Sequence, residues 1–214
     1  MHITNKQLGW LASFAIAILA CGCFQAENPF YGKSDIVTDK RFEGRFVPRT
    51  ANTNSTPSEF ITIKPAKDSH YQLTYRAGNE WVELDAVLFK CGTNLFVDIS
   101  KIAASKIESM PAVGPSGTEL LQLATLYNTH SVVRVRFTEG GIQQGSTHGN
   151  PVYYALQKHP NLKYTVSAPD KPIDPHMKIL TNPTEELHKL LIDAGGDESV
   201  FGFKSDTVWI KSKE

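Results

Sequence analysis

The sequence predicts an α+β fold. An antiparallel β-sheet that curls towards a barrel or a sandwich dominates it, and helices near residues 151–159 and 183–194 pack against the sheet. Two observations predict this fold. Apolar and polar residues alternate in several segments, which is typical of strands with one buried and one wet face. Short links that contain glycine separate these segments, as in β-hairpins. Strands of this kind belong to antiparallel sheets, because parallel strands are usually buried on both faces.

Four segments carry the alternation: Tyr71–Tyr75, Val82–Leu88, Leu95–Ile99 and Val133–Phe137. The links Ala77–Asn79 and Cys91–Thr93 join the first three segments, so we expect a meander from about residue 70 to residue 99. Gly140-Gly141 follows the fourth segment and predicts another hairpin. Ser205–Lys211 is expected to form a final strand.

Two helices are expected to begin with the same pair of residues. Asn150-Pro151 and Asn182-Pro183 each place an N-capping side chain before a proline that fits the first helical turn. Glu185 lies three residues after the second asparagine and is suited to a capping box. Gly195-Gly196 ends the second helix, because glycine readily adopts the backbone angles of a C-terminal cap.

The chain has 214 residues, and we divide it into a signal peptide (1–20), a flexible tether (21–40) and a single β-rich domain (41–214). Leu8–Ala20 is apolar and follows the cation of Lys6. It is shorter than the roughly 20 residues that cross a bilayer, which favours a cleaved export signal. The tether is mostly polar and includes proline and glycine.

Charge limits the partners. The chain has 22 basic and 22 acidic residues, and its basic residues do not form long runs. Binding to nucleic acid requires clustered Lys or Arg that neutralise phosphates. We therefore expect no nucleic-acid partner.

Ile18-Leu19-Ala20-Cys21 resembles the lipobox of bacterial lipoproteins. The resemblance implies that a diacylglycerol is attached to the Cys21 thiol, that the chain is cut before Cys21, and that the new amine is acylated. Cys23 offers a second register. In a Gram-negative host the same resemblance implies anchoring in the outer membrane, facing the periplasm or the cell surface. With Cys21 lipidated, Cys23 and Cys91 remain as a possible disulfide pair in an oxidising compartment.

A second resemblance concerns the domain. Gly44-Arg45-Phe46 is similar to the Gly-x-aromatic opening of lipocalin-like barrels. The lipocalin pairing of a later Arg with a Trp stays open between Arg134 and Arg136 and between Trp81 and Trp209. Short segments between residues 41 and 201 also resemble bacterial lipoproteins of unknown function: Leu95–Asp98, Val133–Val135, Ile179–Thr181 and Thr184–Leu187. Neither resemblance implies an activity.

Candidate site residues are few. Six aromatic residues are candidates to line a ligand cavity if the sheet closes, although core packing is the favoured interpretation: Tyr71, Tyr75, Phe89, Phe96, Tyr153 and Trp209. Glu83, Asp85 and Asp98 are expected on a wet face. The histidines lack metal-ligand spacing, and no nucleophile motif or phosphate-binding loop is present. We therefore expect no catalytic residue, metal or cofactor.

These observations leave three functions open. The first is a lipid-anchored, non-enzymatic envelope protein that binds a partner protein or has a structural role. The second is a lipocalin-like carrier of a small apolar ligand. The third is a periplasmic hydrolase that uses His130 or His148 with nearby acids. In all three, the lipid on the N-terminal cysteine attaches the protein to a membrane.

Overall fold

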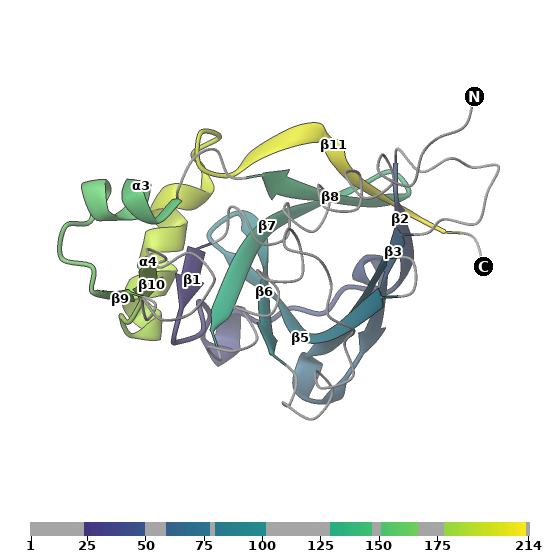
Figure 1. Ribbon diagram of the computed structural model, residues 1–214, viewed down its shortest axis with the longest axis horizontal. Coiled ribbons are helices and arrows are strands. Elements are labelled where there is room, and N and C mark those ends of the chain that lie inside the picture. The colour runs from purple at the N-terminus through teal and green to yellow at the C-terminus, as the bar shows by residue number, and fades with distance from the viewer. Residues whose placement is uncertain are drawn as a thin grey trace.

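The structure is a computed structural model, and it describes residues 24–49, 59–77, 80–101, 129–146, 151–166 and 178–212 (Figure 1). Cys21, Cys23 and His148 lie outside the described residues, so what was expected of them stays a prediction. Tyr153 lies in a described helix, but its side chain is outside the description.

Eight antiparallel strands form a closed β-barrel and follow one another around it in chain order. They are β2 (Gly44–Pro48), β3 (Glu59–Pro65), β4 (Tyr71–Ala77), β5 (Glu80–Cys91), β6 (Asn94–Lys101), β7 (His130–Thr138), β8 (Gly141–Ser146) and β11 (Gly202–Lys211). The ring closes because β11 pairs with both β8 and β2. The sequence left a barrel and a sandwich open, and the structure is a barrel.

The inward faces of these strands form the first of two hydrophobic cores. Leu84, Ala86 and Leu88 of β5 face inward, as the period-two pattern predicted. β4, β5 and β6 confirm the predicted meander. Gly92 and Gly140 occupy the tight turns and have φ angles of 59° and 80°, which glycine adopts without steric cost.

Three short strands extend the sheet outside the barrel: β1 (Phe24–Ala26), β10 (Lys178–Leu180) and β9 (Tyr164–Val166). β1 pairs antiparallel with β7, β10 pairs parallel with β1, and β9 pairs antiparallel with β10. β8 pairs with β7 from Val135 to Thr138, whereas β1 pairs with β7 from His130 to Val132. β1 therefore occupies the part of the β7 edge that β8 does not reach. Figure 1 shows β1 beside β7.

Among the described residues, two α-helices cover one side of the barrel (Figure 1). They are α3 (Pro151–Lys158) and α4 (Thr184–Gly195), close to the predicted bounds. Their apolar residues pack with the outward side chains of β5 and β6 and form the second core. The helices are a minor part of the structure, so the fold is a β-barrel with a small outer layer.

The start of α4 differs from the prediction by one residue. Pro183 is the N-cap, with φ −58° and ψ 155°, and no side chain caps the helix. Asn182 instead bridges two neighbouring segments. Its Oδ1 accepts a hydrogen bond from the backbone N–H of Lys163 at 2.8 Å, and its Nδ2 donates to Glu186 Oε2 at 2.6 Å. This buried amide is satisfied by one distant partner, Lys163, and by Glu186 four residues later, instead of the predicted capping box with Glu185.

Residues 24–40, which were expected to belong to a flexible tether, pack against the barrel. Phe24 and Phe30 are fully buried, and the Val37 N–H donates to the Leu88 carbonyl at 2.9 Å. A few buried aromatic side chains thus fix a segment whose overall composition is polar. The packed body begins within three residues of either candidate lipidation site.

Candidate functional site

The barrel interior contains a cavity of about 50 Å³. Its wall is apolar apart from Gln144, and Leu73, Val97, Val133 and Trp209 are among the apolar residues. These side chains come from five different strands, so closure of the barrel is what brings them together. An apolar cavity of about 150 Å³ stays dry and holds benzene, so this smaller one suits only a slender apolar group.

Phe42 closes one end of the barrel. It ends the short 3₁₀-helix η2 (Lys40–Phe42) and is 2% exposed. Its ring meets the Tyr71 ring edge-on, with centroids 5.0 Å apart. The Asp39 N–H donates to Tyr71 Oη at 2.9 Å. Burial raises the pKa of Tyr71, so this phenol stays neutral and is available as the acceptor.

The glycine of the Gly-x-aromatic opening, Gly44-Arg45-Phe46, is required for a physical reason. Gly44 has φ 123°, and a Cβ there would lie 2.6 Å from Lys211 Cε, so only glycine fits. The Lys211 ammonium lies 5.9 Å from the centre of the Phe46 ring, at the outer limit of a cation–π contact. The cation beside this ring therefore comes from the last strand. Arg134 and Arg136, which the sequence left open as the lipocalin Arg that pairs with Trp81 or Trp209, both lie over the ring of Phe203.

Five of the six aromatic candidates divide between the two cores. Tyr71, Tyr75 and Trp209 face the barrel interior, and Trp209 also lines the cavity. Phe89 and Phe96 face outward and pack in the second core. The Tyr153 side chain lies outside the described residues. Strand parity explains this division, because successive side chains point to opposite faces.

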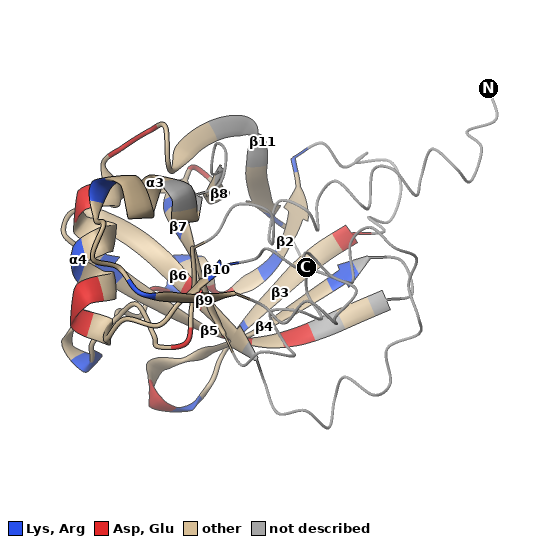
Figure 2. Cartoon of the chain, turned by 60° about the vertical axis from the view of Figure 1, so that its left-hand side comes forward, with Lys and Arg blue, Asp and Glu red and all other residues tan. Residues whose placement is uncertain are grey.

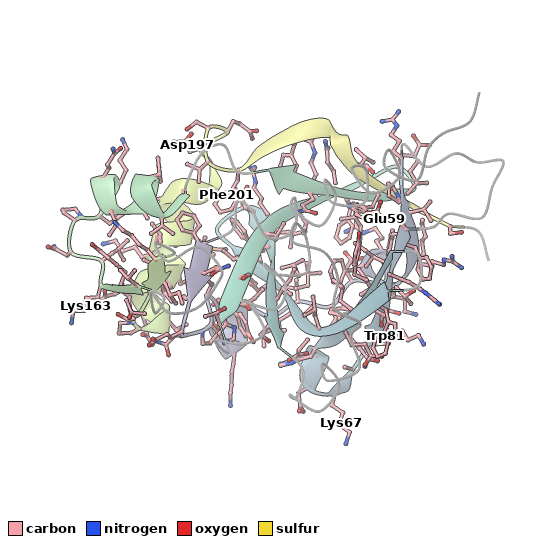
Figure 3. The ribbon with its side chains drawn as sticks, viewed as in Figure 1. Glu59, Lys67, Trp81, Lys163, Asp197 and Phe201 are labelled. Atoms are coloured by element: carbon pink, nitrogen blue, oxygen red, sulfur yellow. The ribbon has the colours of Figure 1, made fainter. Side chains whose placement is uncertain are left out.

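A carboxylic acid lies at the other end of the barrel and was not among the predicted site residues. Glu59 begins β3, and Tyr75 Oη donates to Glu59 Oε1 at 3.0 Å. Burial raises the pKa of Glu59, and the hydrogen bond from Tyr75 opposes that rise only in part. Figure 3 shows Glu59 on the side of the barrel away from α3 and α4.

A buried Asp–His pair lies outside the barrel, between β6 and the segment after β1. The Asp98 side chain is 1% exposed, and its Oδ1 lies 2.8 Å from His130 Nδ1. Its Oδ2 accepts a hydrogen bond from the Phe30 N–H at 3.2 Å. Burial raises the pKa of Asp98, and the contacts with His130 and Phe30 oppose that rise. Asp98 was expected on a wet face; the segment that carries Phe30 covers it.

This pair fastens the segment after β1 to the barrel. His130 is one of the two histidines considered for a hydrolase, but among the described residues no hydroxyl or thiol is hydrogen-bonded to it. Tyr31 lies close by, and burial together with the charges of Asp98 and Asp85 raises its pKa to about 12. A phenol with that pKa is a poor nucleophile at neutral pH.

Every histidine among the described residues is within ion-pair distance of an aspartate. Besides His130, the pairs are His70–Asp85 at 3.0 Å, His159–Asp193 at 3.5 Å and His188–Asp35 at 3.8 Å. The last two pairs join α4 to the residue after α3 and to the 3₁₀-helix η1 (Lys33–Asp35). Three of the four pairs thus hold the outer layer together. Within the described part of the chain, no cluster of His, Cys, Asp and Glu is suited to a metal ion.

Cys91 is buried in the second core, and its Sγ lies 3.5 Å from the His188 carbonyl oxygen. Burial, aided by the charge of Asp35, raises the pKa of the Cys91 thiol to about 12. The thiol is therefore unreactive at neutral pH. The pairing of Cys91 with Cys23 stays a prediction, because Cys23 lies outside the described residues.

Comparisons with protein families, with curated proteins and with solved structures found no match. None of the described helices is both long enough and apolar enough to cross a membrane.

Proposed function

We propose that the protein is an exported envelope protein, anchored by a lipid on Cys21 or Cys23 and without catalytic activity. We further propose that its barrel binds one slender apolar ligand in the manner of a lipocalin. The observation that carries the proposal is an apolar cavity inside a closed eight-stranded barrel. Barrels of this strand number are just wide enough for one small ligand.

The size of the cavity indicates the class of ligand. Pockets for drug-sized molecules measure roughly 300–1,000 Å³, and this cavity is about 50 Å³. Alkyl and acyl chains are the narrowest apolar ligands, so entry of one requires less displacement of the wall than entry of a fused ring system. The ligand we propose is therefore a single acyl or alkyl chain.

The outer surface gives less support to a protein partner. Large apolar side chains that are exposed in the described residues are spread over four elements rather than gathered in one patch: Trp81, Tyr164, Val166, Ile192 and Ile210. A docking face for a stable partner is usually a contiguous apolar patch. Ligand binding inside the barrel is thus better supported than partner binding outside it.

Native mass spectrometry tests ligand binding. Dodecanoate is added to the full-length protein after release from membranes, and we expect one bound chain per protein. Val97→Phe fills the cavity, because Val97 lines it and is 3% exposed, and should weaken binding at least about tenfold. Ile210→Phe, on an exposed position of β11, is the matched control.

Thermal unfolding of both variants checks that they fold. Val133→Leu, a smaller filling change at the cavity wall, serves if Val97→Phe does not fold. Equal dodecanoate binding by the filled and control variants, or no binding by the unaltered protein, would rule out the proposed ligand site.

The mass of the mature N-terminus tests the anchor. We expect the protein purified from membranes to begin at Cys21 or Cys23 and to carry the mass of its acyl chains. Cys21→Ala and Cys23→Ala identify which cysteine is modified. A mature chain that still begins at Met1, or that carries no acyl mass, contradicts the anchor.

A further inference from the structure

The position of the start of β1 determines where a lipid anchor would join the barrel. This inference rests on the proposed lipidation. Cys23 is bonded directly to Phe24, and Cys21 lies three residues before it. Three residues span at most about 11 Å. Phe24 is fully buried beside Val132 and Phe201, with the Phe24 and Phe201 ring centroids 5.5 Å apart. The acyl chains would therefore enter the membrane close to this part of the barrel.

The pairing of β1 with β7 reaches Val132, opposite Phe24. Val133 and Arg134 are the next residues along this edge of β7. Gly145 of β8 already occupies that edge, because a Cβ on Gly145 would lie 3.3 Å from the Arg134 carbonyl oxygen. The start of β1 at Phe24 therefore lies next to the outer face of β7 and the start of β11, where Figure 3 marks Phe201.

An Arg–Phe–Arg cluster occupies this outer face. The guanidinium carbons of Arg134 and Arg136 lie 4.7 Å and 4.2 Å from the centre of the Phe203 ring. Arg136 Nε donates to Gln143 Oε1 at 2.8 Å, which fixes the plane of its guanidinium group. Arg134 Nη1 contacts Glu198 at 3.0 Å, whereas Arg136 is exposed and has no carboxylate partner among the described residues.

We propose that the surface formed by Arg134, Phe203 and Arg136 lies against the phosphate groups of the lipids that surround the anchor. A guanidinium held on an aromatic ring keeps its outer N–H groups available for phosphate oxygens. The positive charge that would face the lipid phosphates is confined to this cluster. Figure 2 shows Lys and Arg interspersed with Asp and Glu over the visible helices and strands, without one large basic face in that view.

The chain contains a matched control surface. Arg45 and Arg76 flank Phe60, with distances of 3.9 Å and 6.0 Å from their guanidinium carbons to the ring centre. This second cluster belongs to β2, β3 and β4. β3 lies opposite β7 in the order of the barrel, so the cluster is far from the start of β1. A barrel that lies on the membrane in one orientation brings only one of the two clusters to the lipid.

The test uses the full-length lipidated protein in vesicles of phosphatidylcholine with or without phosphatidylglycerol. A small fraction of the lipid carries a photoreactive group at its headgroup, and crosslinked peptides are mapped by mass spectrometry. We expect crosslinks at residues 198–203 and 134–143, and few at residues 59–65. With phosphatidylglycerol present, Arg136→Gln should lower the yield at the first surface about fivefold, the contribution of one basic residue near an anionic membrane. Arg76→Gln should leave it unchanged.

The outcomes separate this inference from the proposed function. Acylated protein with equal crosslinking at the two Arg–Phe–Arg clusters overturns the orientation and leaves the anchor intact. Acylated protein whose crosslinks at residues 198–203 do not respond to Arg136→Gln or to phosphatidylglycerol overturns the role of the arginines. Protein purified from membranes without acyl mass removes the anchor, and the orientation fails with it.

Discussion

The two hydrophobic cores of this protein differ in composition and in packing. The inner core is a mixture of aliphatic and aromatic side chains around a cavity. The outer core contains five phenylalanines that are all 0% exposed, and the three closest ring pairs among them have centroids 5.4–5.7 Å apart. The outer core joins β1, the segment after it and both helices to the barrel. The contrast teaches that the barrel interior retains empty space, whereas the outside of the barrel wall is filled and holds β1 and the segment after it in place.

Removing an outer ring should have the largest effect. Phe96 contacts the rings of Phe89 and Phe201 at 5.7 Å and 5.4 Å. Phe96→Ala should lower the free energy of unfolding by about 3–5 kcal/mol, since it leaves a cavity in a filled region. Urea denaturation followed by circular dichroism measures this loss. A loss below about 1 kcal/mol would mean that the outer core is not tightly packed.

The buried ion pair of the outer layer should come next. His130→Ala leaves the Asp98 carboxylate buried with the Phe30 N–H as its remaining hydrogen-bond donor. We expect a loss of about 2–3 kcal/mol at neutral pH, because an underpaired buried charge is costly. Adding Asp98→Asn removes the charge and should restore part of the stability. A double-mutant cycle measures the coupling, and additive losses would contradict a direct pairing.

Substitutions at two neighbouring valines on β7 compare the packing of the two cores most directly. Val132 is 0% exposed in the outer core, and Val133 is 4% exposed at the wall of the cavity. Val132→Ala should cost about 2 kcal/mol and Val133→Ala about 1 kcal/mol, because Val133 already borders empty space and has fewer contacts to lose. Equal costs in urea denaturation would contradict the difference in packing.

The inner core could be predicted from the sequence, and most of the outer core could not. Period-two alternation places Leu84, Leu88 and Val97 inside a sheet, and glycine turns order the strands. The same pattern assigns Phe96 and Asp98 to the other face without revealing that this face is covered. The cover comes from residues distant in the chain, such as Phe30, and the sequence period carries no information about such contacts.

The sequence predicted the type of candidate site but not most of the contacts that form it. Closure of the barrel decides which aromatic residues share the interior, and Trp209 is the one of the six candidates that lines the cavity in the described residues. The side chains that hold the ends of the barrel were missed, because they depend on contacts between distant strands. Lys211 beside Phe46 and Tyr75 with Glu59 are examples. Gly44 was the one local signal, since its φ of 123° favours glycine and the missing Cβ leaves space for the Lys211 side chain.

The smallest effect concerns the rim of the inner core and depends on pH. Burial raises the pKa of Glu59 from its ordinary value of 4.5, so the folded protein holds this proton more tightly than the unfolded chain. As pH rises from about 4 through the folded pKa, the unfolded chain ionises first and stability falls. Glu59→Gln should therefore gain stability over the unaltered protein across this window and keep a constant gain above it.

Tyr75→Phe removes the opposing hydrogen bond and should move the upper limit of the window to higher pH. Urea denaturation at pH 4 to 7 measures both shifts, and a difference that stays constant over this range would show that folding does not raise the pKa of Glu59.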